Sequence, residues 1–374
     1  MSFKYFNISL STCIMVAIVI ISVAMHARHF NKELMGMHVW RQTQTQSTIL
    51  NFYEEDMNIF NPRKNYRGNG DGIFRMEFPL MQWLVAGTYK IFGNHLIISR
   101  IWMFVIGIFS VLGMYKLLKV LFDSEVPALM GAWAFNFSPS FYYHTINPMP
   151  DNLALCLGIW GLAVFFIWRK NEKRHLLILS GFLLSLSALC KLPFILYFAV
   201  PGIYLGLILP RATSIKPQAS ILKAACFSMF MLPVLAWYAL AVPEWHGNGI
   251  VQGIFQNKAS TEVLMGNFFH HLFSTLPELL LNYGSLPFFL AAIYFIFKNK
   301  TYKTAQFPLF ASLGLFLSLY FLFELNMIGK SHDYYLFPFF PVLFILVSYG
   351  AYQLYKIKFR LAGDIVLAIL LVLP

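Results

Sequence analysis

The feature that most constrains the fold is the recurrence of long apolar runs from one end of the chain to the other. A helix of about 17–22 apolar residues can cross a hydrocarbon core of about 30 Å. The mean hydropathy is +0.63 and charged residues make up 12% of the chain, whereas soluble domains carry roughly a quarter. We therefore predict an all-α polytopic membrane protein, a bundle of about eleven spans. The spans are expected near residues 8–25, 97–118, 127–143, 152–168, 176–190, 194–209, 221–242, 283–297, 306–324, 334–355 and 363–374.

Lys and Arg residues are distributed unequally between the connections. Sixteen of the 28 fall before the first span or in short alternate connections, which marks that side as cytoplasmic. The net charge of +12 therefore requires no nucleic-acid partner. We expect one transmembrane domain over residues 1–374 without a soluble C-terminal domain. Its exterior face is expected to carry large loops at 26–96 and 243–282, a short interfacial helix at 79–92, and turns at 144–151, 191–193 and 325–333.

Two polar clusters lie in the first exterior loop. His38, Trp40 and Arg41 follow the first span within ten residues that also hold several amides. Arg grips phosphate with two hydrogen bonds, Trp stacks on sugars or anchors at the interface, and His transfers protons near neutral pH. The alternative is an interfacial aromatic belt. Further on, Arg75 and Glu77 precede an apolar helix that begins at a proline, where Glu77 can act as a base or anchor a basic partner.

Single charged residues at three exterior turns complete the candidate site. Asp151 follows His144 at the start of a span, where a carboxylate can also serve as a helix N-cap. Lys191 ends another span and can simply extend toward the headgroups. His332 and Tyr334 flank Asp333, and His332 with Asp333 can form a base and its orienting group only if both side chains point the same way.

Together these residues suit the transfer of a group from a lipid phosphate to an acceptor. Arg and Lys stabilise the departing phosphate while a carboxylate or imidazole activates the acceptor. No dedicated set of metal ligands is evident in the sequence, although carboxylate pairs can bind Mg²⁺ or Mn²⁺.

The order of these motifs resembles the GT-C superfamily of polyprenyl-phosphate-sugar glycosyltransferases, particularly its protein O-mannosyltransferases and the aminoarabinose transferases of lipid A. The resemblance covers roughly residues 8–355 and implies a helical bundle with an outward-facing active site. It also implies a sugar donor on polyprenyl phosphate, with Asp151 near the donor phosphate, and inversion at the anomeric carbon. The motifs that carry it are Glu77-Phe-Pro-Leu80, Phe92-Gly with Ser99-Arg100, Pro139 with Met149-Pro-Asp151, Ala188-Leu-Cys-Lys191, and His332-Asp-Tyr-Tyr-Leu-Phe-Pro338.

One departure concerns the base. The family places an acidic residue early in the first loop, where this chain reads Met37-His-Val-Trp-Arg-Gln-Thr-Gln-Thr45. His38, Glu77 or Asp151 takes over that role, or the chain has lost transferase activity. We favour His38 with Asp151 as catalytic residues, and Trp40, Arg41, Arg75, Lys191, His332 and Tyr334 as donor-binding residues.

The leading hypothesis is thus an integral membrane glycosyltransferase, hexosyl or pentosyl, that acts on a protein, lipid or glycan of the cell envelope. The basic inner loops and the absence of an organelle signal favour a bacterial inner membrane, with the site facing the exterior. A transporter of lipid-linked saccharides would need charged groups through both halves of the membrane, and the predicted spans hold almost none on the cytoplasmic side. A non-catalytic subunit remains the other alternative.

Overall fold

The computed structural model describes residues 9–65, 70–212, 217–245, 253–256, 259–304 and 306–357. Within these ranges the ordered structure is helical apart from one antiparallel bridge between Arg63 and Ile73. The predicted span 363–374 and part of the predicted loop 243–282 lie outside the described residues.

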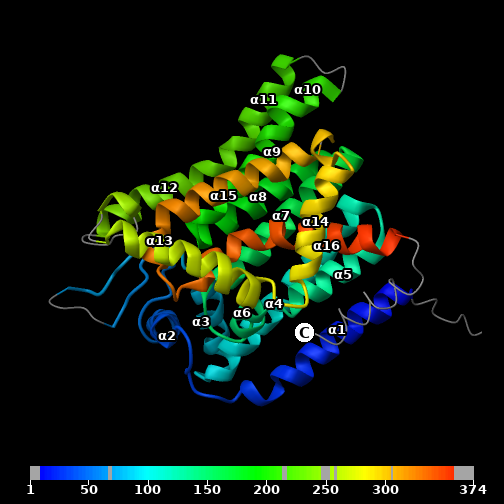
Figure 1. Cartoon of the computed structure of the whole chain (residues 1–374). Helices are drawn as coiled ribbons and strands as arrows, with labels where there is room; N and C mark the ends of the chain where they lie inside the picture. The colour runs from blue at the N-terminus through cyan, green and yellow to red at the C-terminus, as the bar shows by residue number, and fades with distance from the viewer. Residues whose placement is uncertain are drawn as a thin grey trace, which may run out of the picture.

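The α-helices follow one another along the chain and pack into one bundle (Figure 1). They are α1 Leu10–His26, α2 Val39–Glu54, α3 Leu80–Phe92, α4 Leu96–Phe122, α5 Glu125–Asn136, α6 Pro139–His144, α7 Pro150–Asn171, α8 Arg174–Cys190, α9 Ala199–Ile203, α10 Leu209–Ala212, α11 Pro217–Ser228, α12 Leu232–Ala241, α13 Thr261–His270, α14 Leu286–Lys298, α15 Phe307–Ile328 and α16 Phe340–Lys356. Short 3₁₀ and π segments join or extend them: η1 Ala27–His29, η2 Leu192–Phe198, η3 Tyr204–Ile208, η4 Met229–Met231, η5 Val242–Glu244, η6 Gly253–Gln256, η7 His271–Leu280, η8 Thr301–Lys303 and η9 Asp333–Phe339.

The hydropathy pattern located the spans well. Six of the described helical stretches are long and apolar enough to cross a membrane, and shorter apolar helices fill the predicted ranges 176–190, 194–209 and 283–297. The protein is therefore an integral, multi-pass membrane protein. The six long stretches are Leu10–His29, Leu96–Phe122, Pro150–Asn171, Gln218–Glu244, Phe307–Ile328 and Asp333–Lys356.

The predicted span 127–143 was wrong as a single helix. The chain breaks at Phe137–Ser138 and restarts as α6 at Pro139, because proline cannot donate to the preceding turn but suits the first turn of a new helix. The two predicted exterior loops also contain helices: α2 and α3 in 26–96, and α13 with η7 in 243–282. The short helix expected at 79–92 is present as α3.

Helix α7 forms the centre of the bundle. It packs between α4 and α8, and 83% of its most apolar window is buried, compared with 22% for α1. Gly161 permits the close contact with α8, since a Cβ there would collide with Leu184. The N-terminus of this central helix carries Asp151, and the C-terminus of α8 leads into Lys191. The buried central helix α7 and its neighbour α8 therefore position two of the predicted site residues.

Replacing Gly350 by Ala is expected to destabilise the protein. Helix α16 meets α14 at this glycine, where an added Cβ would collide with the carbonyl oxygen of Phe288 and approach the amide nitrogen of Ala292. Backbone atoms cannot move aside as a side chain can, so we expect overpacking to cost about 1–3 kcal/mol. Thermal unfolding in detergent measures this cost. Gly314→Ala in α15 is the matched control, because its added Cβ would have only Val342 Cγ1, at 4.0 Å, as a neighbour. Equal midpoints for the two variants would contradict the packing described.

Candidate active site

A buried ion pair joins the two polar clusters of residues 26–96. Arg41 Nη2 lies 2.5 Å from Glu77 Oε1, and the two side chains are only 10% and 8% exposed. Arg41 lies in the first turn of α2, and Glu77 precedes the Pro79 start of α3. Burial alone would raise the pKa of Glu77, but the charges of Arg41 and Lys191 outweigh burial and hold that pKa below its usual range. Glu77 is thus an ionised partner of Arg41.

A second buried ion pair joins the central helices. Lys191 Nζ lies 3.2 Å from Asp151 Oδ1, with the Asp151 side chain 1% exposed. Burial opposes the charge on Lys191, yet the Asp151 carboxylate keeps the pKa of Lys191 above its usual value. Lys191 also lies over the rings of Tyr334 and Tyr335, at 5.6 and 5.0 Å from their centroids. Such aromatic faces hold a cation without neutralising it.

Asp151 does not serve as a helix cap. The N-cap of α7 is Met149, and Asp151 lies inside the first turn. Within the described chain, neither carboxylate oxygen of Asp151 accepts a hydrogen bond, so Lys191 is held to it by charge alone. A buried carboxylate with free acceptor capacity is costly, which favours a role that involves a substrate.

The two ion pairs are near enough to act on each other. The charges of Glu77 and Asp151 both act on Arg41. The charges of Asp151, Arg41 and Glu77 act on Lys191. The ring of Tyr334 contacts Lys191. The structure thus brings together five of the residues selected from the sequence: Arg41, Glu77, Asp151, Lys191 and Tyr334.

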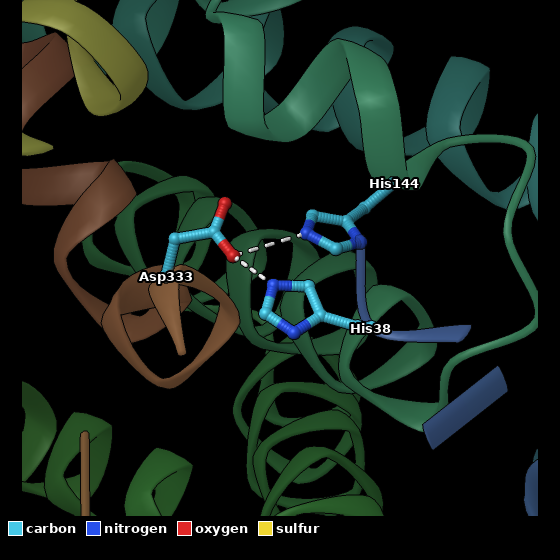
Figure 2. A group of neighbouring side chains, drawn as sticks. All are labelled: His38, His144 and Asp333. Carbon is cyan, nitrogen blue, oxygen red and sulfur yellow. Dashed lines mark hydrogen bonds and ion pairs between the residues drawn. The ribbon is translucent and has the colours of Figure 1, made fainter. Parts of the chain in front are cut away.

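His38 belongs to a neighbouring cluster rather than to the Asp151 pair. Figure 2 shows His38, His144 and Asp333 pointing toward one another. His38 Nε2 lies 2.8 Å from Asp333 Oδ1, and His144 Nε2 lies 3.3 Å from the same oxygen. Ser140 Oγ donates to the other oxygen at 2.5 Å. His38 adopts a left-handed backbone conformation with φ of 58° before α2, a strain of the kind that functional sites retain.

His332 supports this cluster but does not pair with its neighbour Asp333. Its ring stacks on that of His38 with centroids 5.9 Å apart, and its Nδ1 bonds to the carbonyl of Ile328. Burial lowers the pKa of His332, so the ring is neutral at physiological pH. Tyr334 meets His38 edge to face, at 4.8 Å between centroids. Tyr334 thus lies between the cluster and the Lys191 pair.

A cavity of about 340 Å³ opens beside the Arg41–Glu77 pair. Trp40, which is 70% exposed, lines it together with hydroxyl and amide side chains of α2. Asp151 and Lys191 lie next to Arg41 and Glu77 but do not line this cavity. Its lining residues are Trp40, Arg41, Thr43, Gln44, Thr45, Ser47, Thr48, Pro62, Arg63, Lys64, Asn65, Phe74, Met76, Glu77, Pro79 and Gln82.

The structure does not bring Arg75 to these ion pairs. Arg75 Nη1 pairs with Glu244 at 2.5 Å, and the Arg75 side chain also bonds to the carbonyl of Phe60 and to Asn61. Arg75 therefore links this part of the chain to η5, the short segment that follows α12. Its role in donor binding, expected from the sequence, has no support in this geometry.

The sequence paired Asp333 with His332 rather than with His38, and it gave Ser140 and His144 no role in the site. Only a long-range contact reveals them, since Asp333 lies 295 positions from His38 and 189 from His144. The one local signal was that each of the three segments places a His or Asp beside tyrosines or tryptophan at an exterior turn.

The fold has clear structural relatives. ArnT from Cupriavidus metallidurans matches with a TM-score of 0.62 and 14% identity over 93% of this chain. The oligosaccharyltransferase AglB from Archaeoglobus fulgidus matches with a TM-score of 0.59 and 14% identity over 98% of this chain. The family model of dolichyl-phosphate-mannose-protein mannosyltransferases matches residues 77–237. The chain therefore shares its helical fold with ArnT and AglB.

The segment that the family model matches contains Glu77, Asp151 and Lys191. ArnT has been solved with undecaprenyl phosphate, and that structure matches with a TM-score of 0.62 and 14% identity over 96% of this chain. AglB has been solved with an inhibitory peptide and dolichol-phosphate. The chain spans only 62% of the ArnT chain and 52% of the AglB chain. No curated protein sequence matches it.

Proposed function

We propose that the protein is a membrane glycosyltransferase that moves a hexose or pentose from polyprenyl phosphate to an acceptor of the cell envelope. The observation that carries this proposal is the pair of adjacent buried ion pairs, Arg41–Glu77 and Lys191–Asp151, at the centre of a GT-C fold. Two cations held ready by carboxylates, next to a cavity, suit a substrate that carries a phosphate. Glycosyltransferase relatives with lipid-linked donors support the same conclusion.

The donor phosphate is placed at Arg41 and Lys191. Arg41 borders the cavity, and Lys191 is held beside it by Asp151 and the tyrosine rings. As the bond between the anomeric carbon and the phosphate oxygen breaks, negative charge accumulates on the leaving polyprenyl phosphate. Cations already fixed in a site of low dielectric stabilise that charge without reorganisation. Glu77 holds Arg41 in position.

Asp151 is the proposed base. Its oxygens accept no hydrogen bond within the described chain, whereas Nε2 of His38 is already engaged by Asp333. The acceptor oxygen attacks the anomeric carbon from the side opposite the phosphate, its proton passes to Asp151, and polyprenyl phosphate departs. The configuration of the sugar is thereby inverted. The cavity lined by Trp40 and the polar face of α2 borders Arg41 and Glu77, and it is the proposed place for parts of the sugar or acceptor away from the reacting atoms.

The proposed location is a bacterial inner membrane with the site on the exterior face. The support is the concentration of Lys and Arg in the opposite set of short connections. The lipid donor would then reach the site from the outer leaflet.

Mass spectrometry of envelope glycans tests the function even while the sugar and the acceptor are unidentified. Deletion of the gene is expected to remove one sugar from one envelope component, and the wild-type gene is expected to restore it. The Asp151→Asn variant, produced at the same level, is expected not to restore the sugar. An unchanged glycan profile after deletion, or full restoration by Asp151→Asn, would refute the proposal. Movement of lipid-linked saccharide across vesicles without bond cleavage would indicate a transporter instead.

Arg75→Met is expected to retain most of the transfer activity. Arg75 and Glu244 are 27% and 30% exposed, and pairs near the surface contribute only about 0.2–1 kcal/mol to folding stability, so the variant is expected to remain folded. Lys191→Met, assayed per folded protein, is expected to lose far more. The amount of glycan product is measured in the two strains. Equal losses of product would indicate that Arg75 does bind the donor.

A further inference from the structure

Three potential metal ligands converge at the cluster of His38, His144 and Asp333. Their ligand atoms all lie within 4.8 Å of one another. In a tetrahedral site with bonds of about 2.0–2.1 Å, ligand atoms lie about 3.3 Å apart. His144 Nε2 and Asp333 Oδ1 are already separated by 3.3 Å, and His38 Nε2 needs only a small outward movement from 2.8 Å. Figure 2 shows both rings directing a nitrogen at the same carboxylate oxygen.

Asp333 differs from Glu77 and Asp151 in how its negative charge is balanced. Glu77 is paired with Arg41, and Asp151 is paired with Lys191. Asp333 is as buried as Glu77, yet its ion-pair partners in the described part of the chain are two imidazoles. A buried carboxylate needs a compensating positive charge. Either a proton on an imidazole or a bound cation supplies it.

The ligand chemistry and its support select the kind of cation. Two imidazoles with one carboxylate suit zinc and similar transition metals, whereas Mg²⁺ and Ca²⁺ prefer oxygen ligands alone. Ser140 donates to the remaining oxygen of Asp333, which is how outer contacts orient a ligating carboxylate. Three protein ligands leave one position open, as in sites that bind water or substrate.

We propose that His38, His144 and Asp333 bind a divalent transition-metal ion of the zinc type, with its open position available to an anionic oxygen. His38 contacts Tyr334, which in turn contacts Lys191, so the ion adjoins the proposed phosphate site. A role for the ion in holding the donor phosphate rests on the proposed function. Binding of the ion itself does not.

Metal content of the purified full chain tests the proposal. The protein is incubated with Zn²⁺, passed through a desalting column, and analysed by elemental mass spectrometry. We expect about one ion per chain in the wild type, and a loss of affinity of about 10–100-fold or more in Asp333→Asn and His38→Gln. His175→Ala, which alters an exposed histidine at the start of α8, is the matched control and is expected to bind like the wild type. Size-exclusion elution identifies any variant that fails to fold.

Co²⁺ substitution provides a readout that does not depend on variants. A d–d absorption band typical of nitrogen and oxygen ligands in four-coordinate geometry is expected in the wild type. No retained ion and no such band would overturn the proposal and leave a hydrogen-bonded network only. Loss of the sugar from the envelope on gene deletion, together with absent metal, would refute the ion and preserve the glycosyltransferase. A bound ion with an unchanged glycan profile would support the metal site and refute the glycosyltransferase function.

Discussion

Asp151→Asn is expected to reduce sugar transfer by about 10²–10⁴-fold, the contribution that a positioned base makes. Asn matches the shape of Asp151 but cannot take the acceptor proton. Binding of the lipid phosphate is expected to persist, because Lys191 and Arg41 both remain. The measurement is the rate at which the glycan product appears in cells that carry equal amounts of each protein.

A loss of fold must be separated from a loss of chemistry in this variant. Asp151→Asn leaves the buried ammonium of Lys191 without its partner at 3.2 Å, so some destabilisation is expected. Asp151→Glu keeps the charge and is expected to recover stability more than activity, because its longer side chain misplaces the oxygens. Full activity in either variant would remove Asp151 from the role of base.

Arg41→Met is expected to lower the free energy of unfolding by about 3–5 kcal/mol, because it leaves the Glu77 carboxylate buried without its ion-pair partner. The pair is formed at 2.5 Å and is about nine-tenths buried. Thermal or denaturant unfolding in detergent measures the change.

The double variant Arg41→Met with Glu77→Leu is the control for this prediction. Removing both charges replaces the pair by apolar side chains of similar size, which is often neutral or stabilising. We therefore expect the double variant to be close to the wild type and more stable than Arg41→Met alone. Additive losses from the two single changes would mean that the ion pair itself stabilises the fold.

The architecture followed from hydropathy because a membrane leaves few options. A chain without water around it must satisfy its backbone hydrogen bonds within helices, so each apolar run specifies a helix and the basic connections specify its direction. The misjudged span 127–143 shows the limit of this reasoning. The run contains no charged residue, and Ser138-Pro139 indicates the break between α5 and α6.

The candidate site was predictable in its residues but not in its pairings. Buried charge near a membrane marked Glu77, Asp151 and Lys191 as functional. Sequence position gave no sign that Arg41 would pair with Glu77, or that His38 would turn away from Asp151 to Asp333. These choices depend on how α7, α8 and η9 pack. Arg75 was also selected from the sequence, but it pairs with Glu244 instead.

Binding of a lipid phosphate tests the central claim most directly, because it requires neither the sugar nor the acceptor. Purified protein is titrated with undecaprenyl phosphate and, in parallel, with undecaprenol, and complexes are counted by native mass spectrometry. We expect the phosphate to bind far more tightly, and Arg41→Met with Glu77→Leu to lose about 10–100-fold, the worth of one charged hydrogen-bond donor. Equal binding of the two lipids, or unchanged affinity in the double variant, would contradict a phosphate site at Arg41 and Lys191.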